Sequence, residues 1–361
     1  MRVLMTTVPV PAHLAAMVPL ARALRAAGHE VLVAGQPDVQ PTARAARLAA
    51  VCVGGWYHAD DDLFTGLPPG SRPLQISGRP SSAQLAAGVK GFAGHARYMV
   101  PRYLELAREW RPDVVVGSQY EFASPVVAAV LGVPAVSHRS GVDALSAGLR
   151  GMAAFFLTGL CRRLGVDGLP APDLVLDPCP AALQHAGAAP GLPIGPEPLE
   201  TGGEHAGRRG VYVDLSDRTR ALYGRALPPA VEAAVGGPDG VGFAPSMAGC
   251  AAVVHDGSAQ AALAAASRGL PQLVLPQVME EFATGDAVAA AGAGIILDSA
   301  AAQDDPARIG SGLRRLLGEP GFGAAAGRLA RQAAAMPAPD RLVAEVHQLA
   351  TTHRTRRRNA A

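Results

Sequence analysis

The stretch MRVLMTTVPVPAHLAAMVPLARALRAAGHEVLVAG, residues 1–35, decides the fold class of this chain. Residues 3–8 form a short β-rich run, and residues 14–27 keep apolar side chains at helical spacing until Gly28 ends the pattern. Residues 31–34 then repeat the strand pattern. Two strands joined by one helix predict a parallel βαβ unit, in a sheet whose two faces are covered by helices.

The same alternation extends through the rest of the chain, interrupted by a Gly- and Pro-rich stretch at residues 54–80. The elements predicted before the middle of the chain are strands at residues 3–8, 31–34, 51–53, 113–116 and 135–137 and helices at residues 14–27, 39–48, 82–110 and 123–131. Those predicted after it are strands at residues 211–215, 251–254, 272–275 and 295–297 and helices at residues 257–268, 281–291, 304–317, 323–335 and 341–350. The sequence therefore predicts an α/β protein.

The length of 361 residues predicts two domains, since a domain takes about 150 residues. An aperiodic segment rich in Gly, Pro and charge supplies the linker between them. We expect an N-terminal domain over residues 1–190, the linker over 191–210, a C-terminal domain over 211–350 and a basic tail over 351–361. Two doubly wound domains place a ligand cleft between them, at the carboxyl ends of their strands.

Composition and charge exclude several classes of protein. With 49% hydrophobic and 17% charged residues, the chain is neither disordered nor fibrous. A formal net charge of +2 does not supply the basic surface of a nucleic-acid-binding protein. The basic run at residues 354–358 is interpreted as a frayed, solvated tail.

The cysteines and the N-terminus favour a cytoplasmic protein. The four cysteines lie far apart and form no CxxC pair, so we expect reduced thiols rather than a zinc site or a disulfide framework. The chain leads directly into a strand and shows no signal peptide. Its apolar runs end well short of the ~20 residues that a membrane span requires, so no membrane partner is expected.

A histidine, His13, stands in the turn after the first predicted strand. The ordinary pKa of histidine lies near neutral pH, so His13 is a candidate general base; a helix-capping or surface role fits the same position. A catalytic base needs a partner that orients it. The turn after the strand at residues 113–116 offers Glu121, Ser118 or Gln119 for that role.

A second candidate site follows the strand at residues 251–254, where the segment HDGSAQ, residues 255–260, opens a helix. Free amide groups at a helix N-terminus bind anions, and Gly257 would let a phosphate approach the backbone. The segment is therefore a candidate phosphate site. The alternative is that Asp256 or Ser258 only caps the helix.

Two adjacent carboxylates, Glu280 and Glu281, stand at the next strand end and helix start. They are candidates for binding hydroxyl groups, or they only favour the helix dipole. No metal site is expected, because His255 and Asp256 lack further ligands at useful spacing.

Taken together and in order, these turns resemble those of a known family. The likeness is carried by residues 1–35, by LGVPAVSHRSGVD at 131–143, by LPAPDLVLDPCPAALQ at 169–184 and by AAVVHDGSAQAALAAASRGLPQLVLPQVMEEFATGDAVAAAGAGI at 251–295. The chain resembles the GT-B glycosyltransferases of natural-product biosynthesis, in the bacterial macrolide and aromatic-polyketide branch of the UDP-glycosyltransferase superfamily. The resemblance covers nearly the whole chain. It implies the GT-B fold, in which two Rossmann-like domains face a central cleft.

The resemblance also implies a role for each domain. The N-terminal domain would bind a polyketide-like aglycone, and the C-terminal domain a TDP- or UDP-sugar, with no bound metal or other cofactor. A histidine matched by His13 would deprotonate the acceptor hydroxyl for inverting transfer. Ser216 and His255 match phosphate contacts, Glu280 a sugar contact, and Phe243 a residue that packs on the nucleobase. The full set expected to bind the donor is Ser216, Phe243, His255, Gly257, Ser258, Ala259, Glu280 and Glu281.

The chain departs from the family pattern in these turns. The family's phosphate turn usually reads His-His-Gly-Gly-Ala-Gly-Thr, whereas residues 255–261 read HDGSAQA. A glycine and the threonine hydroxyl are lost, and Asp256 adds negative charge beside the expected diphosphate. Glu280 and Glu281 replace an acidic residue followed by Gln, and Thr284 replaces the next Asn.

The C-terminal domain is also expected to be abbreviated. Only residues 216–250 separate its first two predicted strands, where the family fits two more strands with their crossovers. We expect that about one βα unit is missing or collapsed around residues 228–242. In the N-terminal domain, Ser118 stands near the place where the family commonly keeps an acidic partner for its base.

Two functions compete on these observations. The first is an active inverting glycosyltransferase, in which amides at residues 257–259 stabilise the leaving diphosphate. The second is a degenerate homologue that uses no sugar donor and catalyses a rearrangement such as cyclisation, dehydration or isomerisation, or serves as a non-catalytic partner of another enzyme. A nucleotide-sugar epimerase on the same fold is a third interpretation. A homodimer or a complex with a partner enzyme is compatible with the first two.

Overall fold

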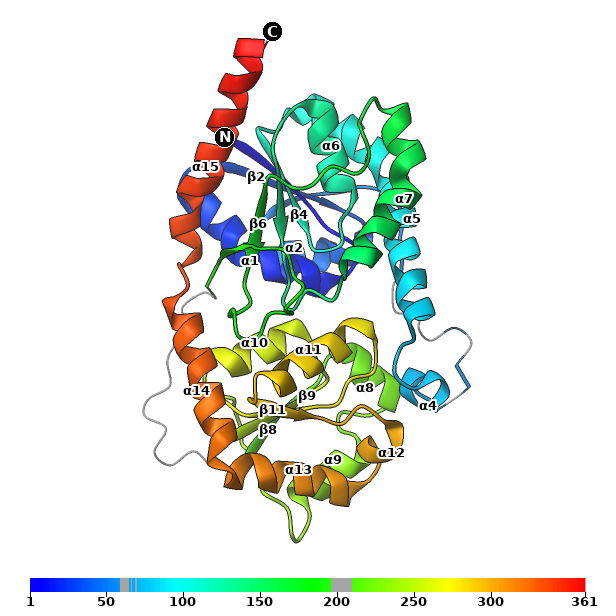
Figure 1. Ribbon diagram of the computed structural model, residues 1–361, viewed down its shortest axis with the longest axis vertical. Coiled ribbons are helices and arrows are strands. Elements are labelled where there is room, and N and C mark those ends of the chain that lie inside the picture. The colour runs from blue at the N-terminus through cyan, green and yellow to red at the C-terminus, as the bar shows by residue number, and fades with distance from the viewer. Residues whose placement is uncertain (59–64, 66, 69, 196–209, 361) are drawn as a thin grey trace.

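The chain folds into two halves that lie one above the other, each built on one parallel β-sheet (Figure 1). The computed structural model describes residues 1–58, 65, 67–68, 70–195 and 210–360, with the side chains of residues 357–360 excepted. The predicted linker therefore lies mostly outside the described residues. We call residues 1–195 the first half and residues 210–338 the second half.

The sheet of the first half has the strand order β3-β2-β1-β4-β5-β6-β7, with every pair parallel. Its strands are β1 (Arg2–Thr6), β2 (Glu30–Gly35), β3 (Ala49–Cys52), β4 (Val114–Ser118), β5 (Ala135–His138), β6 (Leu174–Asp177) and β7 (Leu192–Pro193). The direction of winding reverses between β1 and β4. In sheets of this kind, ligands bind outside the carboxyl ends of the strands at such a reversal.

Helices cover both faces of this sheet, because successive strand side chains point to opposite faces. Val3 and Met5 of β1 pack with α1 (Pro11–Ala26) and α2 (Gln40–Ala45), whereas Leu4 packs with the helices of the other face. Those helices are α5 (Ser82–Trp110), α6 (Ala123–Leu131) and α7 (Ala147–Arg163). A short helix, α4 (Pro73–Ser77), lies apart from both layers and extends toward the second half (Figure 1).

The sheet of the second half has the order β11-β10-β9-β8 and is also parallel. Its strands are β8 (Val211–Asp214), β9 (Ala252–His255), β10 (Gln272–Val274) and β11 (Gly294–Ile296). One face packs on α9 (Pro229–Gly236) and α13 (Pro306–Gly318), and the other on α10 (Ala259–Ser267), α11 (Met279–Ala290) and α14 (Pro320–Ala335). Two parallel-sheet Rossmann-like domains are thus confirmed.

The connection from β8 to β9 is short. The chain there forms α8 (Asp217–Tyr223), α9 and a single bridge between Val211 and Phe243, so β8 is an edge strand of the described sheet. The expectation that a βα unit of the family is missing at residues 228–242 stays a prediction, since it compares this chain with others.

The last helix, α15 (Pro339–Ala360), leaves the second half and packs against the first (Figure 1). Leu342, Val346 and Ala350 are buried in the same cluster as α1 and β1. The basic run at residues 354–358, interpreted as a frayed, solvated tail, lies in this helix, which continues to Ala360, and residues 354–356 are exposed. Buried apolar side chains on the preceding turns hold this segment in a helix.

Several predicted boundaries agree closely with the structure. The helices at residues 82–110 and 123–131 coincide with α5 and α6. The start of α5 is fixed by Ser81, whose Oγ accepts a hydrogen bond from the Gln84 amide. The helix predicted at residues 39–48 is shorter, a 3₁₀ turn at Pro37–Val39 followed by α2.

Candidate functional site

A cavity of about 480 Å³ lies between the two halves. Pro9 and Val10, after β1, contribute to it from the first half, and Arg218 and Glu280 from the second. Its wall in the first half is largely formed by α5, including Phe92 and His95. The cavity therefore lies where the sequence predicts a cleft.

His13 is buried in the first turn of α1. It is not among the lining residues of this cavity, but Val10, three residues earlier in the chain, is, as is Glu280, whose charge acts on His13. Its Nδ1 lies 3.2 Å from the backbone carbonyl oxygen of Gln119, and its ring packs against Tyr120, with centroids 5.6 Å apart. Burial lowers the pKa of His13, while the negative charge of Glu280 acts in the opposite direction. His13 is thus held mainly in its neutral form at neutral pH.

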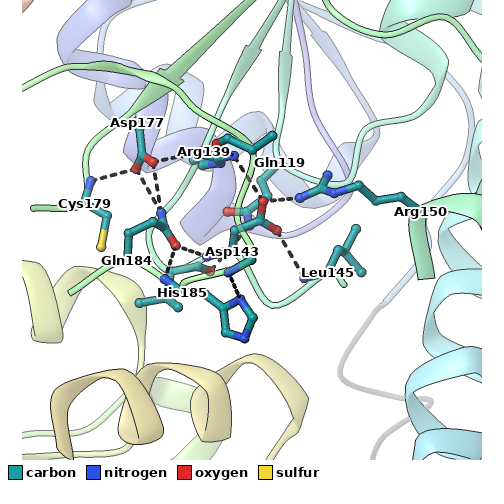
Figure 2. Close-up of polar contacts among 12 residues, drawn as sticks. Gln119, Arg139, Asp143, Leu145, Arg150, Asp177, Cys179, Gln184 and His185 are labelled. Atoms are coloured by element: carbon teal, nitrogen blue, oxygen red, sulfur yellow. Dashed lines mark hydrogen bonds and ion pairs between the residues drawn. The ribbon is translucent and has the colours of Figure 1, made fainter. Parts of the chain in front are cut away.

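The carbonyl that holds His13 is itself fixed by a buried polar network (Figure 2). The side-chain oxygen of Gln119 accepts a hydrogen bond from the Ser140 amide at 2.9 Å. Arg139, which precedes Ser140 in the chain, pairs with Asp177 at 2.5 Å and with Asp143 at 3.2 Å. These charged residues are not among the site residues expected from the sequence, although they lie within the stretches that resemble the family. They fix the loop after β5 against the turn after β4.

Of the three candidate partners of His13, Gln119 contacts it through the backbone carbonyl oxygen, whereas Ser118 and Glu121 contact other groups. Ser118 Oγ accepts a hydrogen bond from Thr7 Oγ1 at 3.1 Å and lies 3.4 Å from the Gln119 carbonyl oxygen. Glu121 is buried, and its Oε2 lies 3.7 Å from Nδ1 of His95. No hydrogen bond or ion pair among the described residues joins Glu121 or Ser118 to His13. The turn after β4 orients His13 through a backbone carbonyl, which side-chain identity does not reveal.

The paired Glu121 and His95 are both uncharged at neutral pH. Burial raises the pKa of Glu121 to about 8 and lowers the pKa of His95 to about 4. Nε2 of His95 lies 2.9 Å from the side-chain oxygen of Gln36. The pair therefore adds no charge to the wall of the cavity.

In the second half, His255 at the end of β9 is fully buried, and both of its ring nitrogens have partners. Nδ1 accepts a hydrogen bond from the Gly257 amide at 3.0 Å, and Nε2 donates to Gln272 Oε1 at 2.8 Å. Burial lowers the pKa of His255. In this arrangement, no ring nitrogen of His255 is left for a phosphate.

The carboxylate of Asp256 accepts hydrogen bonds from Ser216 and Ser258, two of the residues expected to bind the donor. Its carboxylate accepts from the Ser216 amide at 2.9 Å, Ser216 Oγ at 2.5 Å, Thr219 Oγ1 at 2.7 Å and the Ser258 amide at 3.0 Å. These hydrogen bonds hold the pKa of Asp256 below its ordinary value although burial opposes them. Asp256 thus joins the starts of α8 and α10 as a buried anion.

Two close approaches explain the small residues at the start of α10. Gly257 has a φ of +91°, and a Cβ there would meet the Glu281 carbonyl oxygen at 2.6 Å. A Cβ on Gly141, from the first half, would meet the Cβ of Ala259 at 2.7 Å. Gly257 is therefore required by the approach of α11, and Ala259 lies against the other half.

The adjacent acidic residues differ in environment. Glu280 lines the cavity, whereas Glu281 is buried and accepts hydrogen bonds from the Gln277 and Val278 amides at 2.7 and 3.0 Å. Arg218 lies 3.6 Å from Glu280 and 3.8 Å from Glu281. Burial raises the pKa of Glu281 well above its ordinary value. Only Glu280 is placed to meet a ligand in the cavity.

Two further residues singled out in the sequence, Thr284 and Phe243, do not line the cavity between the halves. Thr284 is buried and donates to the Glu280 carbonyl oxygen at 3.1 Å within α11. Phe243 bridges to Val211 at the edge of the sheet, and a Cβ on Gly236 would lie 2.8 Å from its ring. Phe243 is 46% exposed.

A second cavity, of about 440 Å³, lies within the first half between β5, α6 and α7. Tyr120, Asp143, Leu145 and Arg150 line it, and its surface is mainly apolar. The ring of Tyr120 also packs against Phe92, with centroids 5.1 Å apart. Tyr120 thus contacts both cavities' walls.

Within the described residues, no group of three or more His, Cys, Asp or Glu side chains is arranged to hold a metal ion. Over the same part of the chain, no helix is long and apolar enough to cross a membrane. The four cysteines are free thiols.

Two domain families match nearly the whole chain. The N-terminal domain described as erythromycin biosynthesis protein CIII-like matches residues 22–193, and the corresponding C-terminal domain matches residues 211–349. The chain belongs to the erythromycin biosynthesis protein CIII-like family. The L-demethylnoviosyl transferase of Streptomyces niveus is 32% identical over 94% of this chain and 96% of its own. The tylactone mycaminosyltransferase of Streptomyces fradiae is 28% identical over 100% and 95%.

Solved structures place the CIII-like chain in the GT-B fold. Spinosyn rhamnosyltransferase SpnG has a TM-score of 0.82 and 32% identity, with 96% of this chain and 100% of SpnG covered. SpnG has also been solved with thymidine diphosphate and with the spinosyn aglycone, at TM-scores of 0.81 and 0.80. The resemblance to GT-B natural-product glycosyltransferases is thus confirmed, while the abbreviated or degenerate donor domain stays a prediction.

Proposed function

We propose that this protein is an inverting glycosyltransferase that moves a deoxysugar from a TDP-sugar to a hydroxyl of a polyketide-like aglycone. The observation that carries the proposal is the contact between His13 Nδ1 and the Gln119 carbonyl oxygen. A carbonyl oxygen only accepts hydrogen bonds, so Nδ1 carries the proton and Nε2 holds a free electron pair. A neutral imidazole held in this tautomer, three positions after the cavity-lining Val10, is suited to act as a general base.

In the proposed reaction, His13 Nε2 takes the proton of the acceptor hydroxyl as its oxygen attacks the anomeric carbon. The bond from that carbon to the diphosphate oxygen breaks on the opposite side, which inverts the configuration. The imidazolium formed is stabilised by the negative charge of Glu280, whose effect on His13 is to raise its pKa. The same carboxylate is proposed to accept hydrogen bonds from the hydroxyls of the sugar.

The names of the relatives support the two substrate classes. The relatives include transferases of sugars to macrolide-type aglycones, and SpnG has been solved with thymidine diphosphate. The mainly apolar cavities on the two sides of Tyr120 fit a large apolar acceptor with few polar groups. We assign the acceptor to the first half and the donor to the second.

The proposal is tested with His13→Asn, because an Asn amide keeps a donor near the Gln119 carbonyl and removes the base. TDP and UDP are titrated by calorimetry, and transfer is followed as TDP release from TDP-L-rhamnose with a panel of macrolide and anthracycline aglycones. We expect micromolar binding of TDP by both proteins and a transfer rate that falls about 10²–10⁴-fold in the variant. Absence of TDP and UDP binding at millimolar concentration would overturn the transferase proposal.

One observation favours the second function, a homologue without donor chemistry. Asp256 accepts the hydrogen bonds of Ser216 and Ser258 that a diphosphate would need. A bound diphosphate must displace this buried carboxylate or bind beside it with like charge. If neither nucleotide binds, we propose that the family's acceptor cavity serves a sugar-free rearrangement with His13 as acid and base, or presents a ligand to a partner enzyme.

A further inference from the structure

We infer that Arg72, supplied by the first half, is a positioning residue for the turn of the second half that carries Glu280. The inference rests on the proposed function, because it gives a role to the ligand-facing carboxylate Glu280. It arises from the segment of residues 70–80, here called the cross-domain arm, which contains α4. Pro73, Ser77 and Gly78 of this arm also line the cavity between the halves.

Arg72 is 2% exposed, although it lies in a segment outside both layers of its own half. Its Nη1 donates to Gln277 Oε1 and Gln303 Oε1, each at 3.1 Å, and its Nη2 donates to Asp304 Oδ1 at 2.5 Å. Its guanidinium carbon also lies 4.4 Å from the centre of the Tyr223 ring. All four partners belong to the second half, so the guanidinium of Arg72 contacts the half opposite its own backbone.

Gln277, Gln303 and Asp304 lie in segments that follow the carboxyl ends of β10 and β11. Gln277 follows β10, Gln303 ends α12 (Ala300–Gln303), and Tyr223 ends α8. Gln277 Nε2 also donates to Gln303 Oε1 at 2.6 Å, and Gln303 Nε2 donates to the Pro276 carbonyl oxygen at 3.0 Å. A planar guanidinium, with several donors in a fixed fork, is suited to hold three acceptors at once.

This network ends at the carboxylates of the candidate site. The backbone N–H of Gln277 donates to Glu281 Oε2. The carboxylates of Glu281 and Glu280 both lie within 4 Å of Arg218. Fixing the Gln277 side chain therefore fixes the turn at residues 276–281. Arg72 acts on a ligand through this turn, since its own donors are turned to Gln277, Gln303 and Asp304.

Arg79 provides a matched control on the same arm. It pairs with Asp286 and, at 3.5 Å, with Asp298, both in the second half. Its side chain is 44% exposed, so water replaces these partners at little cost. Arg72 and Arg79 therefore both reach the second half. Arg79 contacts α11, where its guanidinium carbon lies 5.4 Å from the centre of the Phe282 ring, whereas Arg72 bonds to the turn at residues 276–281.

The first experiment needs no ligand. Amide hydrogen exchange is followed at residues 276–281, which leaves out the Arg79 contact Phe282, for the wild type, Arg72→Ala, Arg72→Lys and Arg79→Ala. We expect exchange there to rise at least tenfold in Arg72→Ala, to rise less in Arg72→Lys, and to stay at the wild-type rate in Arg79→Ala. Guanidinium ion at low, non-denaturing concentration should restore protection in Arg72→Ala. Unchanged exchange in Arg72→Ala, or an equal rise in Arg79→Ala, would overturn the inference.

The second experiment separates positioning from general loosening. Calorimetry with TDP and with TDP-L-rhamnose should show that Arg72→Ala weakens the TDP-sugar at least fivefold more than TDP, because Glu280 is proposed to meet the sugar. Equal weakening of both ligands would contradict the assigned role. If the wild type binds neither ligand, the proposed function fails, while the exchange experiment still decides whether Arg72 holds the turn.

Discussion

At the scale of single residues, Asp256 is the side chain whose charge and surroundings bear most directly on donor binding. It accepts hydrogen bonds from two residues at the start of α8 and from Ser258 at the start of α10. A buried carboxylate with this many donors stabilises the fold, and it repels a second anion nearby. Its removal should therefore change stability and nucleotide affinity in opposite directions.

We predict that Asp256→Ala lowers the free energy of unfolding by about 2–4 kcal/mol, because buried donors lose their acceptor. The same change should tighten TDP binding at least tenfold in calorimetry. Asp217→Ala, at a fully exposed carboxylate in the first turn of α8, is the control and should alter neither quantity measurably. Weaker TDP binding by Asp256→Ala would show that the carboxylate does not compete with the diphosphate.

Glu121 gives a prediction for pH. Its pKa is raised by burial from 4.5 to about 8, so between these values the unfolded chain releases a proton that the folded protein keeps. The free energy of unfolding then falls as pH rises, by up to about 1.4 kcal/mol per pH unit. His95 opposes this only below pH 6.5, because its pKa is lowered to about 4 and the unfolded chain takes up the proton.

Urea denaturation at several pH values between 6.5 and 8 checks this prediction. Wild-type stability should decrease over that range, and Glu121→Gln should make the decrease shallower, since an amide does not titrate. Glu281, whose pKa burial also raises, contributes to the decrease in both proteins. Equal slopes for the two proteins would mean that Glu121 is already ionised in the folded state.

At the scale of elements, α15 is the helix that joins the end of the chain to its beginning. Its inner side buries Leu342, Val346 and Ala350 against α1 and β1. Toward its end, Arg354 pairs with Asp113 at 2.7 Å on the surface. Burial of the apolar side chains, rather than the surface pair, should hold the helix in place.

We predict that Leu342→Ala lowers the free energy of unfolding by about 2–5 kcal/mol, as a cavity-forming substitution in a core does. Arg354→Ala should lower it by less than about 1 kcal/mol, because the pair is exposed on the Arg354 side and screened by water. Denaturation in urea measures both. A loss of comparable size in the two variants would argue against apolar docking of α15.

At the scale of the whole molecule, the two halves meet at several separated points. The cross-domain arm reaches the second half through Arg72, and Gly141 lies against Ala259 at the start of α10. The absence of a side chain at Gly141 lets the loop after β5 approach α10 this closely. The closeness of the halves therefore depends on one small residue as well as on buried polar contacts.

We predict that Gly141→Leu separates the halves at α10, since a Cβ there would already lie 2.7 Å from the Cβ of Ala259. Small-angle scattering should show a larger radius of gyration, and amide exchange should rise at residues 257–262. Gly148→Leu, near the start of α7 where a Cβ would lie 3.9 Å from its nearest neighbour, is the control. An unchanged radius and unchanged exchange for Gly141→Leu would contradict the prediction.

The sequence by itself determined the fold class, most element positions and the turns that form the site. These follow from local patterns, because the period of apolar residues distinguishes strands from helices and the ends of parallel strands share one edge. His13 and Glu280 were identified in this way, and the structure places Glu280 on the cavity wall, where its charge acts on His13. Local pattern also located α5 and α6 to the residue.

Only the tertiary structure decided which groups meet across the fold. The partner of His13 is a backbone carbonyl, a group that every residue possesses, so the sequence offered only the side chains of Glu121, Ser118 and Gln119 as candidates. Arg72 lies in a Gly- and Pro-rich stretch without period, yet it contacts residues more than 200 positions away. Such contacts depend on how elements pack and on side-chain rotamers, which local sequence patterns do not encode.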